Sequence, residues 1–181
     1  MTTLSLFPRL FHLIDCSSIV AFSGADYAKP NMYIDYRDKI WAHIESMIDG
    51  DKLKTVPQLW EELRFVDESS YIRLRGRRVK FTVELDSNTD PMIIKLLFKY
   101  PDLLSHKAGY TREPCDPYLI VYAQQWKTPI ICDEKSISER IGKNAKKRLS
   151  VPDVCSKENL VCVKLVQYLK EQKIIPLDYH P

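Results

Sequence analysis

The sequence contains little glycine and no glycine-rich motif for binding phosphate. Only 5 glycines stand against 11 prolines in 181 residues, which argues against a loop that cradles phosphate through its backbone. The Gly142-Lys143 pair has neither the upstream glycine nor the following Ser or Thr of a P-loop. The sequence therefore excludes a P-loop nucleotide-binding site.

Cysteine and histidine are present, but their spacing is typical of neither a zinc site nor a redox motif. The cysteines are odd in number, no two are spaced as C-x-x-C, and the four histidines have no mutual spacing that suits zinc. Most of the thiols sit among Ile, Val or Pro, where a free cysteine packs as a small hydrophobe. This usage predicts a reducing, cytoplasmic setting. The five cysteines are Cys16, Cys115, Cys132, Cys155 and Cys162.

We expect neither a signal peptide nor a membrane span. The first 22 residues are rich in apolar side chains, but Pro8, Arg9 and Asp15 interrupt them, and neither a cationic start nor a small-residue cleavage site is present. The net charge of +3 is modest, so only local clusters of charge could indicate a nucleic-acid partner. Length and composition predict a single globular domain over residues 1–181.

Short apolar segments alternate with segments of helical periodicity along the chain. Ile40, Ile44 and Ile48 mark one face of a helix, with Asp35 expected as its N-cap and Gly50 as its stop. The alternation predicts a parallel sheet covered by helices on both faces, an α/β fold. We expect strands at residues 11–15, 53–56, 129–134 and 159–164, helices at 16–22, 36–50, 57–64, 90–100, from 116 onward and at 166–173, and a turn at 151–155.

Acidic residues follow or approach several of these strands. Asp15 ends the first strand, the acids at 133–134 end the third, and Asp116 opens the helix that leads into the third. The acids at 61–62 lie on the helix that leaves the second strand. Ligands of parallel sheets bind outside the carboxyl ends of the strands, so these side chains are candidates for one site.

Acids gathered at one rim would repel one another unless a cation neutralised them. Carboxylate oxygens suit Mg²⁺ or Mn²⁺, and two such ions about 3.5–4 Å apart can activate water and stabilise the leaving oxygen of a phosphodiester. Ser17, two residues after Asp15, is placed to hydrogen-bond a carboxylate or a metal-bound water. The pattern thus indicates hydrolysis of a nucleic-acid backbone.

Each acid also has an ordinary structural explanation. Asp116 before Pro117 fits a helix N-cap followed by a first-turn proline. Asp15 could equally cap the helix after it, the acids at 61–62 could be a solvated surface pair, and those at 133–134 could belong to an ordinary loop. Independent capping gives no reason for the acids to meet, so their convergence is what separates the two interpretations.

Four motifs, in this order, resemble those of the PIN-domain superfamily, whose best-known bacterial members are the VapC-like ribonuclease toxins. LIDCSSIV resembles the opening strand–Asp–x–Ser motif, and TVPQLWEEL resembles the second motif, in which a glutamate precedes an apolar residue. CDPYLIVYA resembles the third, an aspartate that opens a buried helix, and PIICDEKS resembles the fourth. The tail PDVC…NLVCVKLVQYL resembles a PIN-like branch catalogued as a domain of unknown function, and the matches run from about residue 11 to residue 170.

The resemblance implies a three-layer αβα sandwich with a central, mostly parallel sheet, and it implies a set of metal ligands. Asp15, Glu62 and Asp116 would be the core ligands. Glu62 is preferred to its neighbour Glu61 because it immediately precedes Leu63, although the two differ by only about 100° around the helix.

The fourth motif departs from the family pattern. Asp133 and Glu134 compete for the fourth ligand position, and the family commonly has a Thr two residues before this acid. Cys132 stands two residues before Glu134, and this spacing favours Glu134 as the ligand. The change from Thr to Cys removes a hydroxyl that would form strong hydrogen bonds. Asp153, in the VPDVC segment, could supply an acid from the rim instead.

The resemblance implies a metal-dependent endoribonuclease, the toxin of a toxin–antitoxin pair, with Mg²⁺ or Mn²⁺ as cofactor. It implies an RNA substrate, a cognate antitoxin and a homodimer, and we expect a cytoplasmic protein without a membrane partner. The altered fourth motif favours an alternative, a catalytically weak PIN-like module that binds RNA or protein. A DNA-directed nuclease would use the same metal chemistry.

Two basic clusters bear on the substrate. Residues 73–80 hold five cationic side chains, and residues 142–148 hold four. Lys and Arg of this kind would contact phosphates independently of sequence and with steep salt dependence, although a solvated helix face explains such clusters equally well. The candidate phosphate-binding residues are Arg73, Arg75, Arg77, Arg78, Lys143, Lys146, Lys147 and Arg148.

Overall fold

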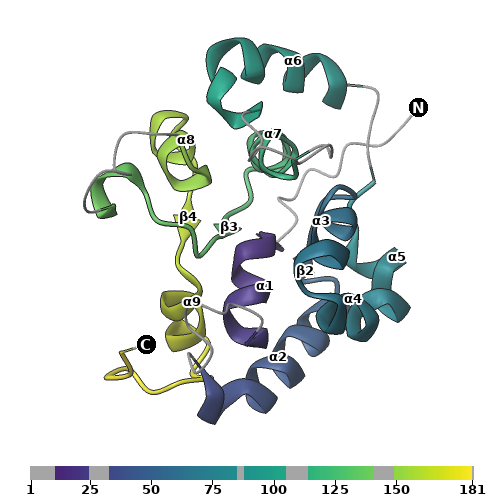
Figure 1. The fold of residues 1–181 in the computed structure, drawn as a ribbon, viewed down its shortest axis with the longest axis vertical. Helices are drawn as coiled ribbons and strands as arrows, with labels where there is room; N and C mark the ends of the chain where they lie inside the picture. Colours follow the sequence, from purple (N-terminus) through teal and green to yellow (C-terminus); the bar gives the residue numbers. More distant parts are fainter. Residues whose placement is uncertain (1–10, 25–32, 85–87, 105–113, 141–148, 181) are drawn as a thin grey trace.

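The structure is a computed structural model, and it describes residues 11–24, 33–84, 88–104, 114–140 and 149–180. Within these ranges the chain forms an α/β fold with helices on both sides of one sheet (Figure 1). The helices are α1 (Cys16–Ser23), α2 (Arg37–Asp49), α3 (Leu59–Val66), α4 (Glu68–Leu74), α5 (Arg78–Phe81), α6 (Thr89–Lys99), α7 (Asp116–Trp126), α8 (Val151–Lys157) and α9 (Leu165–Glu171), with 3₁₀ turns at Ile34–Tyr36, Arg75–Arg77, Pro101–Leu104 and Ile137–Glu139.

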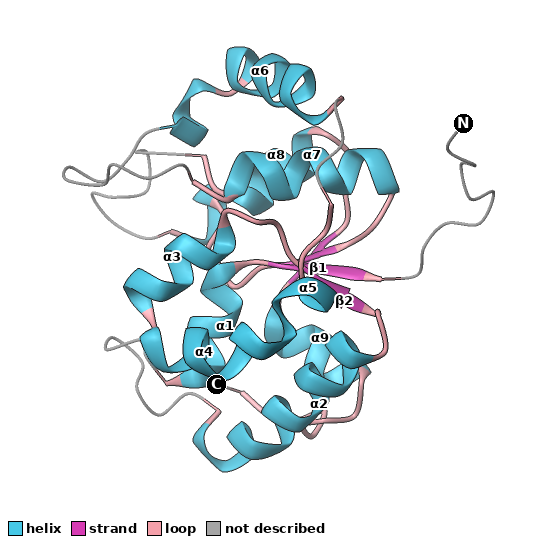
Figure 2. Ribbon diagram, turned by 90° about the vertical axis from the view of Figure 1, so that its right-hand side faces the viewer, coloured by secondary structure: helices cyan, strands magenta, loops and turns pink. Residues whose placement is uncertain are grey.

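The sheet has four parallel strands in the order β2-β1-β3-β4, as the alternation of strands and helices predicts. The strands are short: β1 is His12–Ile14, β2 is Leu53–Lys54, β3 is Ile130–Ile131 and β4 is Cys162–Val163. In Figure 2 the strands lie between α7 and α8 on one side and α1, α2 and α9 on the other. This arrangement is the three-layer αβα sandwich expected from the sequence.

The register between β1 and β3 fixes which residues leave the sheet together. Ile14 pairs with Ile131, and the amide of Asp15 donates to the carbonyl of Ile131 at 3.0 Å. Because the strands are parallel, the residues after both pairs emerge at the same carboxyl rim. Asp15 and Cys132 are therefore neighbours in space although they are 117 positions apart.

Helix α7 is apolar nearly all round and is buried, as its sequence predicts. Its residues from Pro117 to Ala123 are all buried, and it packs between α6, α8 and β3. A helix that is apolar on every face must be covered on every face. Its position between the sheet and α6 brings its first turn to the rim where β1 and β3 end.

Two local predictions were wrong. The segment 151–155 is not a turn but most of helix α8, and it starts with a capping box between Ser150 and Asp153 and a first-turn proline. Asp35 does not cap α2 because it lies within a 3₁₀ turn, and the N-cap position of α2 falls at Tyr36.

Candidate metal centre

Asp15 combines the two roles that its sequence left open. It is 3% exposed, and its side chain caps α1 by accepting from the amides of Cys16 at 2.7 Å and Ser17 at 3.3 Å. The hydroxyl of Ser17 also donates to Asp15 Oδ2 at 2.5 Å, which is the supporting hydrogen bond expected of this serine. The carboxylate is thus fixed in orientation at the end of β1.

Two buried thiols contact the carboxylate of Asp15, one at each oxygen. Cys115 Sγ lies 3.5 Å from Oδ1, and Cys132 Sγ lies 3.4 Å from Oδ2. Cys132 comes from the rim of β3, where the PIN resemblance has a hydroxyl residue, and its thiol also lies 3.8 Å from Ser17 Oγ. A thiol therefore supplies a weaker contact at the position where the missing hydroxyl was expected.

Asp116 joins this group from the start of α7. Its Oδ1 lies 3.8 Å from Cys115 Sγ, and one ligand atom from each of Asp15, Cys115 and Asp116 can be chosen so that all lie within 4.8 Å of one another. The N-cap position of α7 falls at Cys115 and Asp116 is the first helical residue, so Asp116 is not the N-cap that its sequence also allowed. The cluster joins residues a hundred positions apart.

Glu62 acts electrostatically on the same cluster. Burial is the main reason why the pKa of the Cys115 thiol is well above its usual value, and Glu62 is the largest contribution from a charged group, ahead of Asp15 and Asp116. The pKa of Cys16 rises for the same reasons, again with burial first and Glu62 second. Glu62 is half-buried whereas Glu61 is exposed, and of this pair Glu62 is the one whose charge raises these two pKa values.

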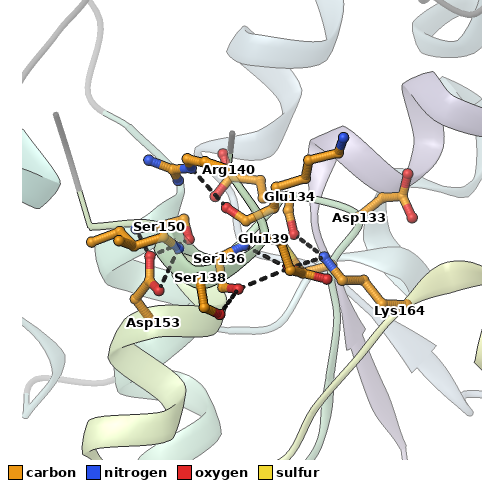
Figure 3. Close-up of polar contacts among 12 residues, drawn as sticks. Asp133, Glu134, Ser136, Ser138, Glu139, Arg140, Ser150, Asp153 and Lys164 are labelled. Carbon is orange, nitrogen blue, oxygen red and sulfur yellow. Dashed lines mark hydrogen bonds and ion pairs between the residues drawn. The ribbon is translucent and has the colours of Figure 1, made fainter. Parts of the chain in front are cut away.

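The acids of the fourth motif diverge. Glu134 Oε2 accepts from the amide of Val151 at 3.2 Å, at the start of α8, and the backbone carbonyl of Glu134 accepts from the ammonium of Lys164. The side chain of Asp133 points away from Glu134 and Lys164 (Figure 3). The backbone amide of Asp133 donates to Ser17 Oγ at 3.2 Å. Glu134 thus contacts the start of α8 through its side chain, whereas Asp133 contacts the cap of Asp15 through its backbone amide.

Asp153 accepts hydrogen bonds that stabilise the start of α8. Its Oδ2 accepts from the amide and the hydroxyl of Ser150 at 2.8 and 2.6 Å, and its Oδ1 accepts from the amide of Ile137 at 2.8 Å (Figure 3). Burial tends to raise the pKa of this carboxyl, but the hydrogen bonds outweigh burial and the pKa is lowered. These bonds explain Asp153 as a capping residue.

Sequence reasoning missed two buried residues near the centre. Cys115 was read only as a small hydrophobe, although its place directly before Asp116 was a usable signal. Asp67 is 5% exposed, caps α4 through the amide of Ser70 at 3.1 Å and accepts from the hydroxyl of Ser69 at 2.7 Å. Burial tends to raise the pKa of Asp67, but hydrogen bonds from hydroxyl and amide groups lower it, so this acid has a structural explanation.

Arginines of the first basic cluster form ion pairs with α2 and lie over aromatic rings. Arg73 Nε lies 2.5 Å from Glu45 Oε1, and its guanidinium lies 4.4 Å from the ring centre of Trp41. Arg77 pairs with Asp49 at 3.1 Å. Arg78 lies over the ring of Trp60, and Arg75 is exposed. The second cluster, Lys143, Lys146, Lys147 and Arg148, lies outside the described residues.

The donor set at the rim fits a divalent cation. Two carboxylates and a thiol within 4.8 Å of one another can share one ion, and Glu62 adds negative charge from one side. Asp15 and Asp116 would hold the ion, with Cys115 as a third donor. This fit rests on the chemistry of the side chains and on the fold, which brings them to the carboxyl rim of the sheet.

A family model described as "Domain of unknown function (DUF4411)" matches residues 12–175. The match contains the whole sheet and all of the residues of the candidate centre. No curated protein matches the chain. Among the described residues, no helix has both the length and the apolar character needed to cross a membrane.

Proposed function

Because the chain belongs to the DUF4411 family, whose function is unknown, we propose an activity from the chemistry of its site: a metal-dependent endoribonuclease of PIN type. The observation that carries the proposal is the convergence of Asp15, Cys115 and Asp116 within 4.8 Å at the carboxyl rim of a parallel sheet. Ligand sites of α/β folds lie at this rim, and the order of the four motifs supports the PIN assignment.

The side chains have separate tasks in this proposal. Asp15 and Asp116 bind the cation, which the PIN resemblance gives as Mg²⁺ or Mn²⁺, and Glu62 adds to the negative potential that attracts it. Ser17 and the amide of Cys16 hold the Asp15 carboxylate in one orientation. When bound, the cation would supply a water of lowered pKa and stabilise charge on the phosphodiester.

The geometry supports one well-formed cation position more than two. Glu134 and Asp153 are each bound to backbone amides around α8, so their oxygens already have structural partners. Asp133 meets the cap of Asp15 through its backbone amide, which donates to Ser17 Oγ. The proposal therefore assigns one cation to the group formed by Asp15, Cys115 and Asp116.

A cleavage assay with a matched pair of variants tests the proposal. Asp116→Asn keeps the size of the side chain but removes its charge, and it should reduce Mn²⁺-dependent cleavage of single-stranded RNA at least ~100-fold, because a direct ligand should cost no less than an outer-shell partner. Asp90→Asn is the control, since Asp90 also lies in the first turn of a helix but is exposed. Equal cleavage by Asp116→Asn and the wild type would refute the nuclease.

The thiols favour one alternative function, an RNA-binding or protein-binding module with little catalysis. Both oxygens of Asp15 have a thiol within 3.5 Å, an unusual environment for an ion that prefers oxygen ligands. A binding module would show no metal-dependent cleavage in the wild type, and Asp116→Asn would leave its affinity for RNA unchanged.

A substrate panel that includes DNA separates ribonuclease from deoxyribonuclease activity. The antitoxin and the homodimer stay proposals that rest on the resemblance.

A further inference from the structure

We propose that Cys115 is a sulfur ligand of the candidate centre, which therefore prefers cations of the zinc and cobalt type to Mg²⁺. The inference rests on the metal site of the proposed nuclease and names the class of ion that this site would select. Thiolate sulfur favours Zn²⁺ and related soft or borderline ions, whereas a purely carboxylate site suits Mg²⁺ and Mn²⁺. One residue would thus decide the choice of metal.

The distances around Cys115 match the spacing of ligands on one ion. For a tetrahedral ion with a metal–sulfur distance of about 2.3 Å and a metal–oxygen distance of about 2.1 Å, sulfur and oxygen ligands lie about 3.6 Å apart. Cys115 Sγ lies 3.5 Å from Asp15 Oδ1 and 3.8 Å from Asp116 Oδ1. The sulfur therefore needs little movement to share an ion with both carboxylates.

The backbone and the packing hold the sulfur in this position. Cys115 is completely buried and occupies the N-cap position of α7, where its carbonyl accepts from the amide of Leu119 at 3.0 Å. The next residue is Asp116, so one short stretch of chain offers two donors of different chemistry.

Cys132 provides a matched control. Its thiol is also completely buried and lies 3.4 Å from Asp15, but on the other oxygen, and next to the hydroxyl of Ser17 rather than next to Asp116. The group of donors within 4.8 Å contains Cys115 and not Cys132. Replacing either thiol by a hydroxyl is a small change in volume, so the two variants differ mainly in which side of Asp15 they alter.

Cobalt spectroscopy on the reduced, metal-free, full-length protein tests the inference directly. Co²⁺ bound to sulfur gives a charge-transfer band in the near ultraviolet, and this band reports the ligand whether or not RNA is cleaved. We expect the band in the wild type and in Cys132→Ser, its loss in Cys115→Ser, and its removal by stoichiometric Zn²⁺ but not by a large excess of Mg²⁺. Asp116→Asn should keep the band but bind Co²⁺ more than about tenfold more weakly.

Circular dichroism and thermal unfolding show whether each variant is folded, and a Cys115→Ala variant replaces Cys115→Ser if the latter is not. A band that persists in folded Cys115→Ser, or that Cys132→Ser removes, would overturn the inference. Cleavage supported by Mg²⁺ without any charge-transfer band would also overturn it while leaving the nuclease intact. A band that follows the expected pattern in a protein that cleaves no RNA would support the inference and remove the nuclease.

Discussion

Two groups of acids lie near the carboxyl rim of the sheet, and they differ in what they are bound to. Asp15 and Asp116, with the thiol of Cys115, form the candidate centre. Glu134 and Asp153 form the second group, around the start of α8 (Figure 3). In the sequence, strand and helix ends mark Asp15, Asp116 and Glu134 alike, and the PIN resemblance ranks Asp15 and Asp116 as core ligands and Asp153 only as a substitute.

The difference between Asp15 and Asp153 lies in two thiols that contact Asp15 in addition to its strong hydrogen-bond donors. Asp153 accepts hydrogen bonds from two backbone amides and a hydroxyl, and these strong donors hold the start of α8 in place. Asp15 likewise accepts from two backbone amides and the Ser17 hydroxyl, but each of its oxygens has in addition a thiol within 3.5 Å. A thiol is a weak donor whose proton a metal ion can replace. An acid that contacts thiols in addition to its capping donors is thus the better candidate for function.

Removing the charge of Asp15 should have the largest effect on activity. Asp15→Asn keeps a capping oxygen for α1 but removes a central ligand, so we expect Mn²⁺-dependent RNA cleavage to fall at least ~100-fold, which corresponds to about 2.7 kcal/mol. Initial rates at saturating Mn²⁺ measure the effect. A rate within about twofold of the wild type would mean that the two groups of acids do not differ in function.

Removing Asp153 should affect stability instead. Asp153→Ala leaves the amides of Ser150 and Ile137 without their acceptor, and loss of such a cap costs about 2 kcal/mol. Urea denaturation should show this loss, while the cleavage activity per folded molecule stays close to that of the wild type. Loss of activity in fully folded Asp153→Ala would instead assign Asp153 to the site.

The adjacent glutamates provide a finer comparison. Glu62→Gln should lower cleavage about tenfold, or about 1.4 kcal/mol, because it removes negative charge beside the centre. Glu61→Gln changes an exposed neighbour in the same way and should leave the rate unchanged. Measuring kcat and KM for both variants at limiting Mn²⁺ checks the difference, and equal effects would mean that only general negative charge matters.

The smallest expected effect concerns acid stability near α8. The amide of Ser136 above all, together with Lys164 and the Ser136 hydroxyl, lowers the pKa of Glu139 from 4.5 to about 2, against a smaller opposing effect of burial. A lowered pKa stabilises the fold above the unfolded value, and this stabilisation is lost as the pH falls from about 4.5 toward about 2. Because Glu139 is substantially exposed, solvent screens the effect.

Glu139→Gln should therefore show a shallower fall of Tm than the wild type between about pH 5 and pH 2. The two proteins should differ most in slope near pH 3–4, where only the unfolded wild-type chain binds the extra proton. Parallel curves over this range would show that the Ser136 amide does not stabilise the carboxylate in solution.

The sheet could be predicted from the sequence because burial leaves a strong local signal. The apolar residues before Asp15 and the all-apolar α7 each indicate a buried element on their own. The capping role of Asp153 could not be predicted so well, because one of its three donors, the Ile137 amide, comes from a separate segment. The S-x-x-D pattern at Ser150 is also a sign of a helix N-terminus, which the interpretation of residues 151–155 as a turn overlooks.

The composition of the centre was predicted in part. Asp15 and Asp116 follow from strand and helix ends, which the sequence marks. The thiols of Cys115 and Cys132 do not, because a cysteine among apolar residues gives the same pattern whether it packs in the core or faces a carboxylate. Only the parallel register of β1 and β3 brings Cys132 next to Asp15.

The position of a bound metal ion tests the central claim most directly. Anomalous diffraction from a crystal of the wild-type protein soaked in Mn²⁺ would locate the ion independently of any activity. We predict a peak in contact with Asp15 and Asp116 and beside Cys115. The claim would be contradicted by a map without a peak at saturating Mn²⁺, or by a peak at Glu134 and Asp153 instead.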